Sequence, residues 1–369
     1  MASTTTDPRT DRMQDEPPSG RQPREAGTLG AAARSERQPL ARLGSLTGVR
    51  ILGTGCYVPD RIVRNEDLRE LGYDADWIVQ RTGILERRRA APEQATSDLA
   101  VEASRQCLEQ AGLHPDELDL ILLATMTPDM PAPSTACALQ HRLGATAPAI
   151  DINAACAGFI YALVTGMQFV KTGCCRHVLV VGSDVMTRIV DPEDRKTFPL
   201  FGDGAGAVVL GRGSREQGFL SFTLGADGSG NDFLCMPTGG SREPITHAAL
   251  DARRQYVQMD GRSVFKWAVR TVQESIRDVL ERASTTVDQI DLFVLHQANI
   301  RIIDALVADL AIPRDRVLVN LDRYGNTSAA SIPLVLGEGQ RAGRIGRGGR
   351  ILVAGFGAGL AWGAGVLEW

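Results

Sequence analysis

The sequence lacks the features of a secreted, membrane-spanning or metal-binding protein. Its seven cysteines are scattered and odd in number, with no CxxC pair and no histidine at a spacing typical of zinc. No apolar run is long enough to span a bilayer, and the amino terminus has no apolar stretch typical of a secretory signal. Acidic residues such as Asp7 and Glu16 argue against an organelle transit peptide. We therefore expect a reduced, cytoplasmic protein without a metal and without membrane attachment.

The sequence also lacks a large excess of one charge sign, so its net charge gives no reason to expect a polyanionic partner. The chain has 40 basic and 44 acidic side chains and a formal net charge of -4. Neither nucleic acid nor an anionic membrane is expected on this balance, so a basic surface for a partner must be local. With 369 residues, 43% of them hydrophobic, the chain has room for one large core or two fused ones around an enclosed site.

Residues 1–46 have few large apolar side chains and are rich in Pro, Gly, Ser, Thr, Arg and acids. Such a segment cannot offset its ordering entropy by burial, so we predict a disordered amino-terminal extension. The first expected strand begins at Val49 and runs into the glycines of a Gly-Thr-Gly sequence.

An internal repeat carries most of the information about the fold. Residues 107–123 match residues 279–295 without gaps, and each copy reads as an amphipathic helix, a polar turn and an apolar strand. Residues 177–182 likewise resemble residues 350–355. The repeat predicts two duplicated α/β halves, 47–220 and 221–369. Because the predicted strands are continuously apolar, they suit sheets with helices on both faces, and a layered α/β sandwich follows.

Three residues stand where strands end and helices begin, which is where active sites form in such folds. Cys156 opens a predicted helix, where unpaired backbone N–H groups favour a thiolate. His296 follows an apolar strand, and Asn326 lies in a small-residue turn that is the counterpart of the Cys156 turn. Taken singly, each has a structural alternative: a buried cysteine, a hydrogen-bonded histidine and an ordinary Gly-Asn turn.

Together the three residues have complementary chemistry. A cysteine can carry an acyl group as a thioester, while a neutral histidine and an asparagine can donate hydrogen bonds to one carbonyl oxygen. Such donors stabilise an enolate, which loss of carbon dioxide from a malonyl thioester would produce. The expected reaction is a decarboxylating carbon–carbon condensation.

Seven motifs support this interpretation. They resemble motifs of the β-ketoacyl-acyl-carrier-protein synthase III family, whose members initiate bacterial fatty-acid chains. The resemblance extends from about Val49 to Trp369. The resemblance rests on residues 53–55, 77–84, 153–159, 201–207, 296–299, 325–327 and 355–359.

The resemblance implies a thiolase-like αβαβα sandwich and a decarboxylative Claisen condensation of an acyl-CoA starter with malonyl-acyl-carrier protein, in fatty-acid or polyketide synthesis. It implies no cofactor apart from the coenzyme A thioester, which is a substrate, and a homodimer as the assembly. Cys156 would be the nucleophile, and His296 and Asn326 would bind the malonyl carbonyl. The backbone N–H groups of Cys156 and Ala358 would form a second oxyanion hole.

The resemblance also assigns residues to three binding regions. Coenzyme A would contact Trp77, Arg81 and Arg195, since purines stack well on indole and guanidinium faces. The basic carrier-protein rim would consist of Lys266 and Arg301, with Ala308 at a position where the family has a further basic residue. The acyl pocket would be formed by Ala132, Met186, Phe201 and Phe356.

Two other functions remain open from the sequence. One is an acyltransferase on the same scaffold that passes the acyl group to oxygen or nitrogen without condensation; the paired His296 and Asn326 argue against it, because no enolate would need stabilising. The other is a non-catalytic scaffold subunit, and the intact Cys156 argues against that.

Overall fold

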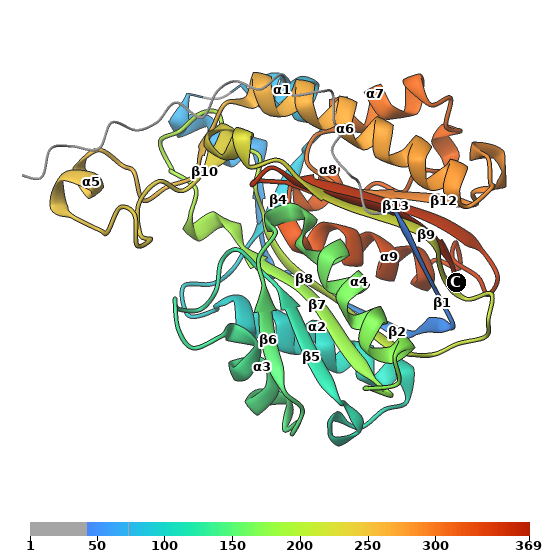
Figure 1. Ribbon diagram of the computed structural model, residues 1–369. Coiled ribbons are helices and arrows are strands. Elements are labelled where there is room, and N and C mark those ends of the chain that lie inside the picture. Colours follow the sequence, from blue (N-terminus) through green and yellow to red (C-terminus); the bar gives the residue numbers. More distant parts are fainter. Residues whose placement is uncertain (1–42, 73) are drawn as a thin grey trace, which may run out of the picture. The chain divides into compact units, whose positions relative to one another are not determined.

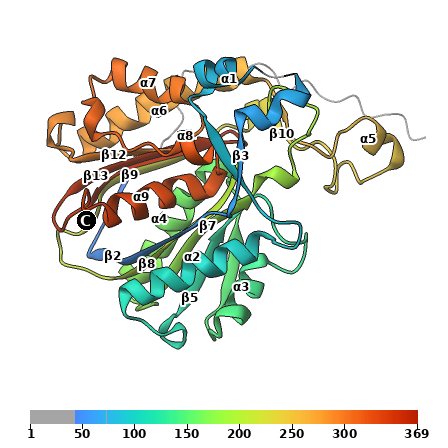
Figure 2. The same cartoon turned by 180° about the vertical axis from the view of Figure 1, so that it is seen from behind.

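The computed structural model describes residues 43–72 and 74–369, which fold into two five-stranded sheets with helices between and outside them (Figure 1). The layers alternate as helix, sheet, helix, sheet, helix, and this confirms the predicted αβαβα sandwich (Figures 1 and 2). None of the described helices is both long and apolar enough to cross a membrane.

The first sheet belongs to the amino-terminal half and has the strand order β2-β8-β7-β5-β6. Strand β5 runs parallel to β6 and β7, whereas β8 is antiparallel to β7 and β2. All residues of β5 and β7 are buried, as expected for strands covered on both faces. The bounds are β2 (Val49–Tyr57), β5 (Leu120–Ala124), β6 (Ala149–Ile152), β7 (Val178–Val185) and β8 (Asp203–Arg212).

The second sheet has the order β1-β9-β14-β13-β12 and repeats the pairing of the first. Leu120 of β5 pairs with Val178 of β7, and Leu292 of β12 pairs with Ile351 of β13, so the register matches the sequence repeat. The duplication predicted from the sequence is therefore present in the strand pairing. The bounds are β1 (Gly44–Thr47), β9 (Gly218–Ala226), β12 (Leu292–Leu295), β13 (Arg350–Gly357) and β14 (Ala361–Glu368).

Helices α4 (Gly158–Lys171) and α9 (Ser331–Arg341) form the central layer between the sheets (Figure 1). Most of their residues are buried, because both sheets cover them. Helices α2 (Thr96–Ala111) and α3 (Thr135–Leu143) pack on the outer face of the first sheet, and α6 (Gly261–Arg282) and α7 (Ile300–Asp309) on that of the second.

The remaining elements are short. They comprise β3 (Arg61–Arg64), β4 (Glu86–Arg89), β10 (Leu234–Cys235), β11 (Gln258–Met259), α1 (Ala75–Thr82), α5 (His247–Asp251) and α8 (Leu321–Tyr324). The described 3-10 turns are η1 (Asn65–Leu71), η2 (Pro115–Glu117), η3 (Ala155–Ala157), η4 (Met186–Arg188), η5 (Gly228–Phe233), η6 (Val287–Gln289), η7 (Arg314–Arg316) and η8 (Ser328–Ala330).

Two predicted boundaries are wrong. The extension was predicted to reach residue 46, but residues 44–47 form β1, whose backbone pairs with β9 in the second sheet. Residues 1–42 lie outside the described residues. The predicted division between 220 and 221 cuts through β9, all of which belongs to the second sheet, so the halves divide within residues 213–217. In both places the hydrogen bonds between backbone strands determine the structure, and the local side chains give no signal of that pairing.

Candidate active site

Cys156 lies in η3, between the end of β6 and the start of α4. The turn is tight: Ala155 has a φ of 46°, and its N–H donates to Oδ1 of Asn153 at 3.1 Å. The end of β13 approaches so closely that a Cβ on Gly357 would lie 2.6 Å from the backbone nitrogen of Cys156. Glycine is therefore required there, and the cysteine is held by both halves of the chain.

The Asn326 turn repeats this geometry in the second half, as predicted. Ser328 has a φ of 51°, and its N–H donates to Oδ1 of Asn326 at 2.9 Å. Because the side-chain oxygen is engaged in the turn, the amide nitrogen of Asn326 is the end that can donate to a ligand. The backbone of Asn326 is clamped by the segment before β8: its N–H donates to Leu200 O at 2.8 Å, and Gly202 N–H donates to its carbonyl at 3.1 Å.

His296 follows β12, and its backbone N–H donates to Ala354 O at 2.8 Å. Its Nδ1 lies 2.6 Å from Oγ of Ser331, the first residue of α9. The N–H of Gln297 points at the same oxygen, at 3.4 Å, and we assign the Ser331 hydroxyl as the donor to Nδ1. Burial lowers the pKa of His296 to about 3, so the ring is neutral. A neutral ring that accepts at Nδ1 carries its proton on Nε2 and can donate from there.

The protonation of Cys156 differs from the sequence expectation. Burial raises the pKa of the Cys156 thiol to about 12; the neighbouring Ser328 hydroxyl lowers this pKa, and the nearby Asp184 carboxylate raises it. The start of a helix was expected to favour a thiolate, but desolvation outweighs that effect in a side chain only 5% exposed. The resting nucleophile is a thiol.

Cys156, His296 and Asn326 line one cavity of about 140 Å³, so the structure brings the three predicted residues together. Phe201 and Phe356 line it too, and the ring of Phe356 meets that of His296 edge to face at 5.3 Å. The cavity is also lined by residues of α6 and α7, including Val264, Phe265 and Ile302, and by Asn299, which caps α7. A thiol and two neutral polar side chains thus line one mostly apolar cavity.

Comparisons with known proteins decide the family. A model of 3-oxoacyl-[acyl-carrier-protein] synthase III matches residues 150–228, and a model of its C-terminal part matches residues 280–369. A beta-ketoacyl-[acyl-carrier-protein] synthase III of Rhodopirellula baltica is 58% identical over an aligned length of 345 residues, and the alignment covers 89% of this chain and 100% of that relative. The chain belongs to the synthase III family.

Solved structures of relatives agree with this assignment. The Aquifex aeolicus synthase III is 44% identical, covers 87% of this chain and 100% of its own, and superposes with a TM-score of 0.81. The priming β-ketosynthase of the R1128 polyketide pathway is 39% identical, covers 89% of this chain and 98% of its own, and also has a TM-score of 0.81.

The residues expected to bind coenzyme A lie on α1 and beside the residues that precede it, and a hydrogen bond joins α1 to a lining residue of the synthase III cavity. Trp77 on α1 is 46% exposed, and the Arg81 guanidinium is 5.4 Å from the centre of its ring. Asn299, which lines the cavity, donates from Nδ2 to Arg81 O at 3.1 Å and so joins α1 to the cavity. Arg195 lies against Gly72, just before α1.

The predicted carrier-protein residues lie on α6 and α7, next to residues that line the cavity. The Arg301 guanidinium lies 5.7 Å from the ring centre of Phe265, a lining residue, and Lys266 is the exposed residue that follows it on α6. Ala308 is exposed further along α7 and adds no charge.

The remaining predicted pocket residues lie apart from this cavity. Met186 is buried in a core cluster that includes Phe201, and Ala132 is exposed in the loop before α3; neither lines the cavity in the described part of the chain. Ala358 lines a separate hollow of about 450 Å³, together with Ala155, the residue before Cys156.

Sequence reasoning missed the residues that hold the site in place. Asp184, at the end of β7, is fully buried and accepts hydrogen bonds from the Thr125 and Thr127 hydroxyls at 2.9 and 2.8 Å and from Ala329 N–H at 3.1 Å. It joins the first sheet to the Asn326 turn. A carboxylate that ends an apolar strand was a signal available in the sequence. Within the described residues, no cluster of three His, Cys, Asp or Glu side chains could hold a metal ion.

Replacing Ser331 by alanine removes the hydroxyl that fixes the His296 tautomer. We expect decarboxylation of the malonyl substrate to slow on the order of 10- to 100-fold, the range seen when groups that orient histidines in metal sites are lost. Acylation of Cys156 should be unchanged. Rates of carbon dioxide release and mass spectrometry of the acylated protein would measure the two steps.

The matched control for this prediction is Ser275→Ala on α6, which deletes another largely buried helical hydroxyl, one that donates to Thr271 O at 2.8 Å. Equal slowing in both serine variants would contradict a specific role for Ser331.

Proposed function

We propose that this chain catalyses the decarboxylative condensation of an acyl-CoA starter with malonyl-acyl-carrier protein, giving a β-ketoacyl thioester that begins a fatty-acid or polyketide chain. The observation that carries the proposal is the convergence of the Cys156 thiol, the Nε2 donor of His296 and the amide of Asn326 on one cavity. This proposal matches the names of the relatives described above.

In the first half-reaction, Sγ of Cys156 attacks the carbonyl carbon of the acyl-CoA. The tetrahedral oxyanion would accept hydrogen bonds from the backbone N–H groups of Cys156 and Ala358, which the close approach of Gly357 brings near each other. The carbon–sulfur bond to coenzyme A then breaks, and coenzyme A leaves as the thiol with the proton that Cys156 gives up. The product is an acyl thioester on Cys156.

In the second half-reaction, the malonyl thioester replaces coenzyme A and loses carbon dioxide. The electron pair of the broken carbon–carbon bond becomes an enolate, whose oxygen accepts hydrogen bonds from His296 and Asn326. The enolate carbon attacks the acyl carbonyl, and Cys156 leaves as a thiolate that takes up one proton from solvent to restore the resting thiol. Neutral donors suit this step, since the negative charge of the malonyl carboxylate moves to the thioester oxygen only as carbon dioxide departs.

The alternative of acyl transfer to oxygen or nitrogen has less support. Such a transfer would need a group that activates a hydroxyl or an amine. The His296 ring and the Asn326 amide are instead suited to donate hydrogen bonds to an oxygen that becomes negatively charged. A non-catalytic scaffold would need no cysteine in a cavity. The starter and the pathway stay open between fatty-acid and polyketide synthesis, because relatives of both kinds are similar to this chain. We also propose that the enzyme uses no cofactor beyond its substrates and acts in the cytoplasm.

Separate half-reactions give the test of this function. Cys156→Ser should gain no acyl mass from acyl-CoA, because a serine hydroxyl is far harder to ionise at this buried position. His296→Ala and Asn326→Ala should still become acylated but lose carbon dioxide release on the order of 100- to 1000-fold, the cost of deleting one donor to a developing oxyanion. Intact decarboxylation in both donor variants would refute the condensation mechanism.

We propose a homodimer formed along the edge strand β6. In the described part of the chain β6 pairs only with β5, so its other edge is open, and Ile150 on it is 47% exposed. The 126–131 loop, which follows the neighbouring strand β5, lines a hollow of about 490 Å³ and includes the exposed Met130. An open sheet edge next to exposed apolar side chains favours pairing with a second copy.

Light scattering at micromolar concentration should give twice the chain mass of 39.7 kDa. Replacing Ile150 with lysine should shift the equilibrium toward the monomer, because a charge on an edge strand opposes pairing. A wild-type monomer at these concentrations would contradict the proposed assembly.

Starter choice should depend on Ala132. In the resembling family this loop enters the partner's acyl pocket, and an acetyl-selective member has phenylalanine where this chain has Ala132. A small residue leaves volume that close-packed neighbours cannot fully refill. Each further buried methylene of the starter contributes about 0.8 kcal/mol, so longer or branched acyl groups should be preferred over acetyl several-fold per carbon.

Comparing kcat/KM for acetyl-, butyryl- and branched acyl-CoA in the wild type and in Ala132→Phe tests this. The phenylalanine should restore a preference for acetyl. If the wild type already prefers acetyl and the substitution leaves that preference unaltered, this loop does not limit the pocket.

A further inference from the structure

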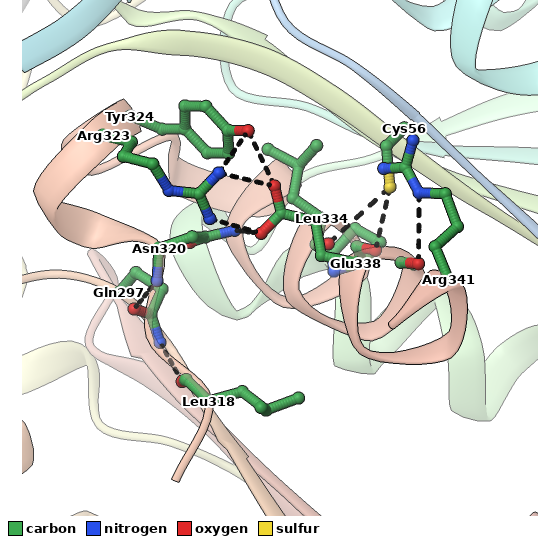
Figure 3. Close-up of polar contacts among 11 residues, drawn as sticks. Cys56, Gln297, Leu318, Asn320, Arg323, Tyr324, Leu334, Glu338 and Arg341 are labelled. Atoms are coloured by element: carbon green, nitrogen blue, oxygen red, sulfur yellow. Dashed lines mark hydrogen bonds and ion pairs between the residues drawn. The ribbon is translucent and has the colours of Figure 1, made fainter. Parts of the chain in front are cut away.

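The carboxylate of Glu338 on α9 binds three side chains from the short segment that leads to Asn326. It accepts a hydrogen bond from the Tyr324 hydroxyl at 2.7 Å, from Asn320 Nδ2 at 3.1 Å and from Arg323 Nη2 at 2.9 Å (Figure 3). The Arg323 guanidinium also stacks on the Tyr324 ring at 4.8 Å. One carboxylate therefore fixes α8 at both of its ends.

The position of α8 sets the position of Asn326. Tyr324 is the last residue of α8, and Gly325, with a φ of 66°, turns the chain directly into Asn326. The N–H of Gly325 donates to Leu321 O at 2.9 Å, so the turn is continuous with the helix. A shift of α8 would therefore displace the Asn326 amide with it.

The same cluster reaches the histidine. The backbone N–H of Asn320 donates to Oε1 of Gln297 at 3.2 Å, and Nε2 of Gln297 donates to Leu295 O at 2.6 Å. Gln297 directly follows His296 in the sequence and is fully buried. The Gln297 amide and the Glu338 carboxylate thus meet at Asn320, which links the loop of the histidine to the loop of the asparagine.

The environment makes these contacts strong. The Glu338 side chain is only 24% exposed, and its contacts with Arg323 are charge-assisted. Burial raises the pKa of Tyr324 to about 12, with the adjacent carboxylate adding to the effect, so the phenol keeps the proton that it donates. In the described part of the chain, Glu338 has no hydrogen bond to the Cys156 turn.

We propose that Glu338 is a positioning residue for the decarboxylation half-reaction: it holds the loops of His296 and Asn326 in register so that their donors converge on one oxygen. The inference rests on the proposed condensing function. It predicts that disturbing Glu338 affects decarboxylation and leaves the acylation of Cys156 alone.

The test is Glu338→Gln in the full-length protein. The glutamine oxygen can still accept from Tyr324, but its NH₂ group faces the NH₂ of Asn320 and the guanidinium of Arg323, all of them donors. We expect carbon dioxide release from malonyl-acyl-carrier protein to fall on the order of 10- to 100-fold, since a displacement of about 1 Å can cost 100-fold. The fall should lie in kcat, with Cys156 acylated by acyl-CoA at the wild-type rate.

Glu368→Gln is the matched control. Glu368, on β14, pairs with Arg350 at 3.0 Å and is 18% exposed, so it resembles Glu338 in exposure and in its arginine partner but contacts neither donor loop. It should leave both half-reactions unchanged. Tyr324→Phe deletes one donor to Glu338 and keeps the ring, so it should also slow decarboxylation, by a smaller factor than Glu338→Gln. This variant tests the same role if Glu338→Gln folds poorly.

The outcomes separate the inference from the function. If wild-type protein releases carbon dioxide and both Glu338→Gln and Tyr324→Phe retain that rate, the positioning role is wrong and the function stands. Equal losses in acylation and decarboxylation would also overturn it, as they would mean general destabilisation. If the wild type acylates Cys156 but never decarboxylates a malonyl thioester, the proposed function fails and takes the inference with it.

Discussion

The active site depends on the contact between two equivalent turns, one from each half of the chain. Both contain a residue with positive φ, Ala155 and Ser328, and both are closed by an asparagine side chain. Each turn lies against a strand end of the fold so tightly that glycine is required: Gly357 against Cys156, and Gly182 against the Ala329 carbonyl. The central helices start from these turns, so the packing of the two sheets on α4 and α9 determines where the reactive groups meet.

The duplication was also the part of the structure that the sequence predicted best. The ungapped match between residues 107–123 and 279–295 predicted the layers and the strand register, because equivalent positions of β5 and β12 pair with equivalent positions of β7 and β13. The same symmetry predicted that Cys156 and Asn326 lie close together. Strand β1 was missed, since a four-residue edge strand is held by backbone hydrogen bonds to β9 and leaves little trace in its side chains.

The supporting polar residues could not have been predicted in the same way. Ser331, Asp184 and Glu338 act on segments 35, 145 and 18 residues away in the sequence, through side-chain contacts that have no periodic signature. The burial of the reactive groups also comes from segments that are far apart in the sequence. These segments form the layers that desolvate His296 and Cys156, and this desolvation moves both pKa values away from their usual ranges. Local sequence indicates which groups are present, whereas the packed layers set their protonation.

These protonation states bear on the order of events in the site. A neutral histidine and a thiol carry no charge, so the resting cavity needs no counterion and can stay closed to water. Negative charge then develops on an oxygen in each half-reaction, first on the acyl oxygen and later on the enolate oxygen, and in the proposed mechanism each oxyanion has its own donors. Backbone donors for the first oxyanion and the His296 and Asn326 side chains for the second would let one nucleophile serve two reactions in succession. This arrangement also explains why a positioning contact such as that of Glu338 can affect the second reaction without touching the first: the donors it holds are absent from the first oxyanion hole.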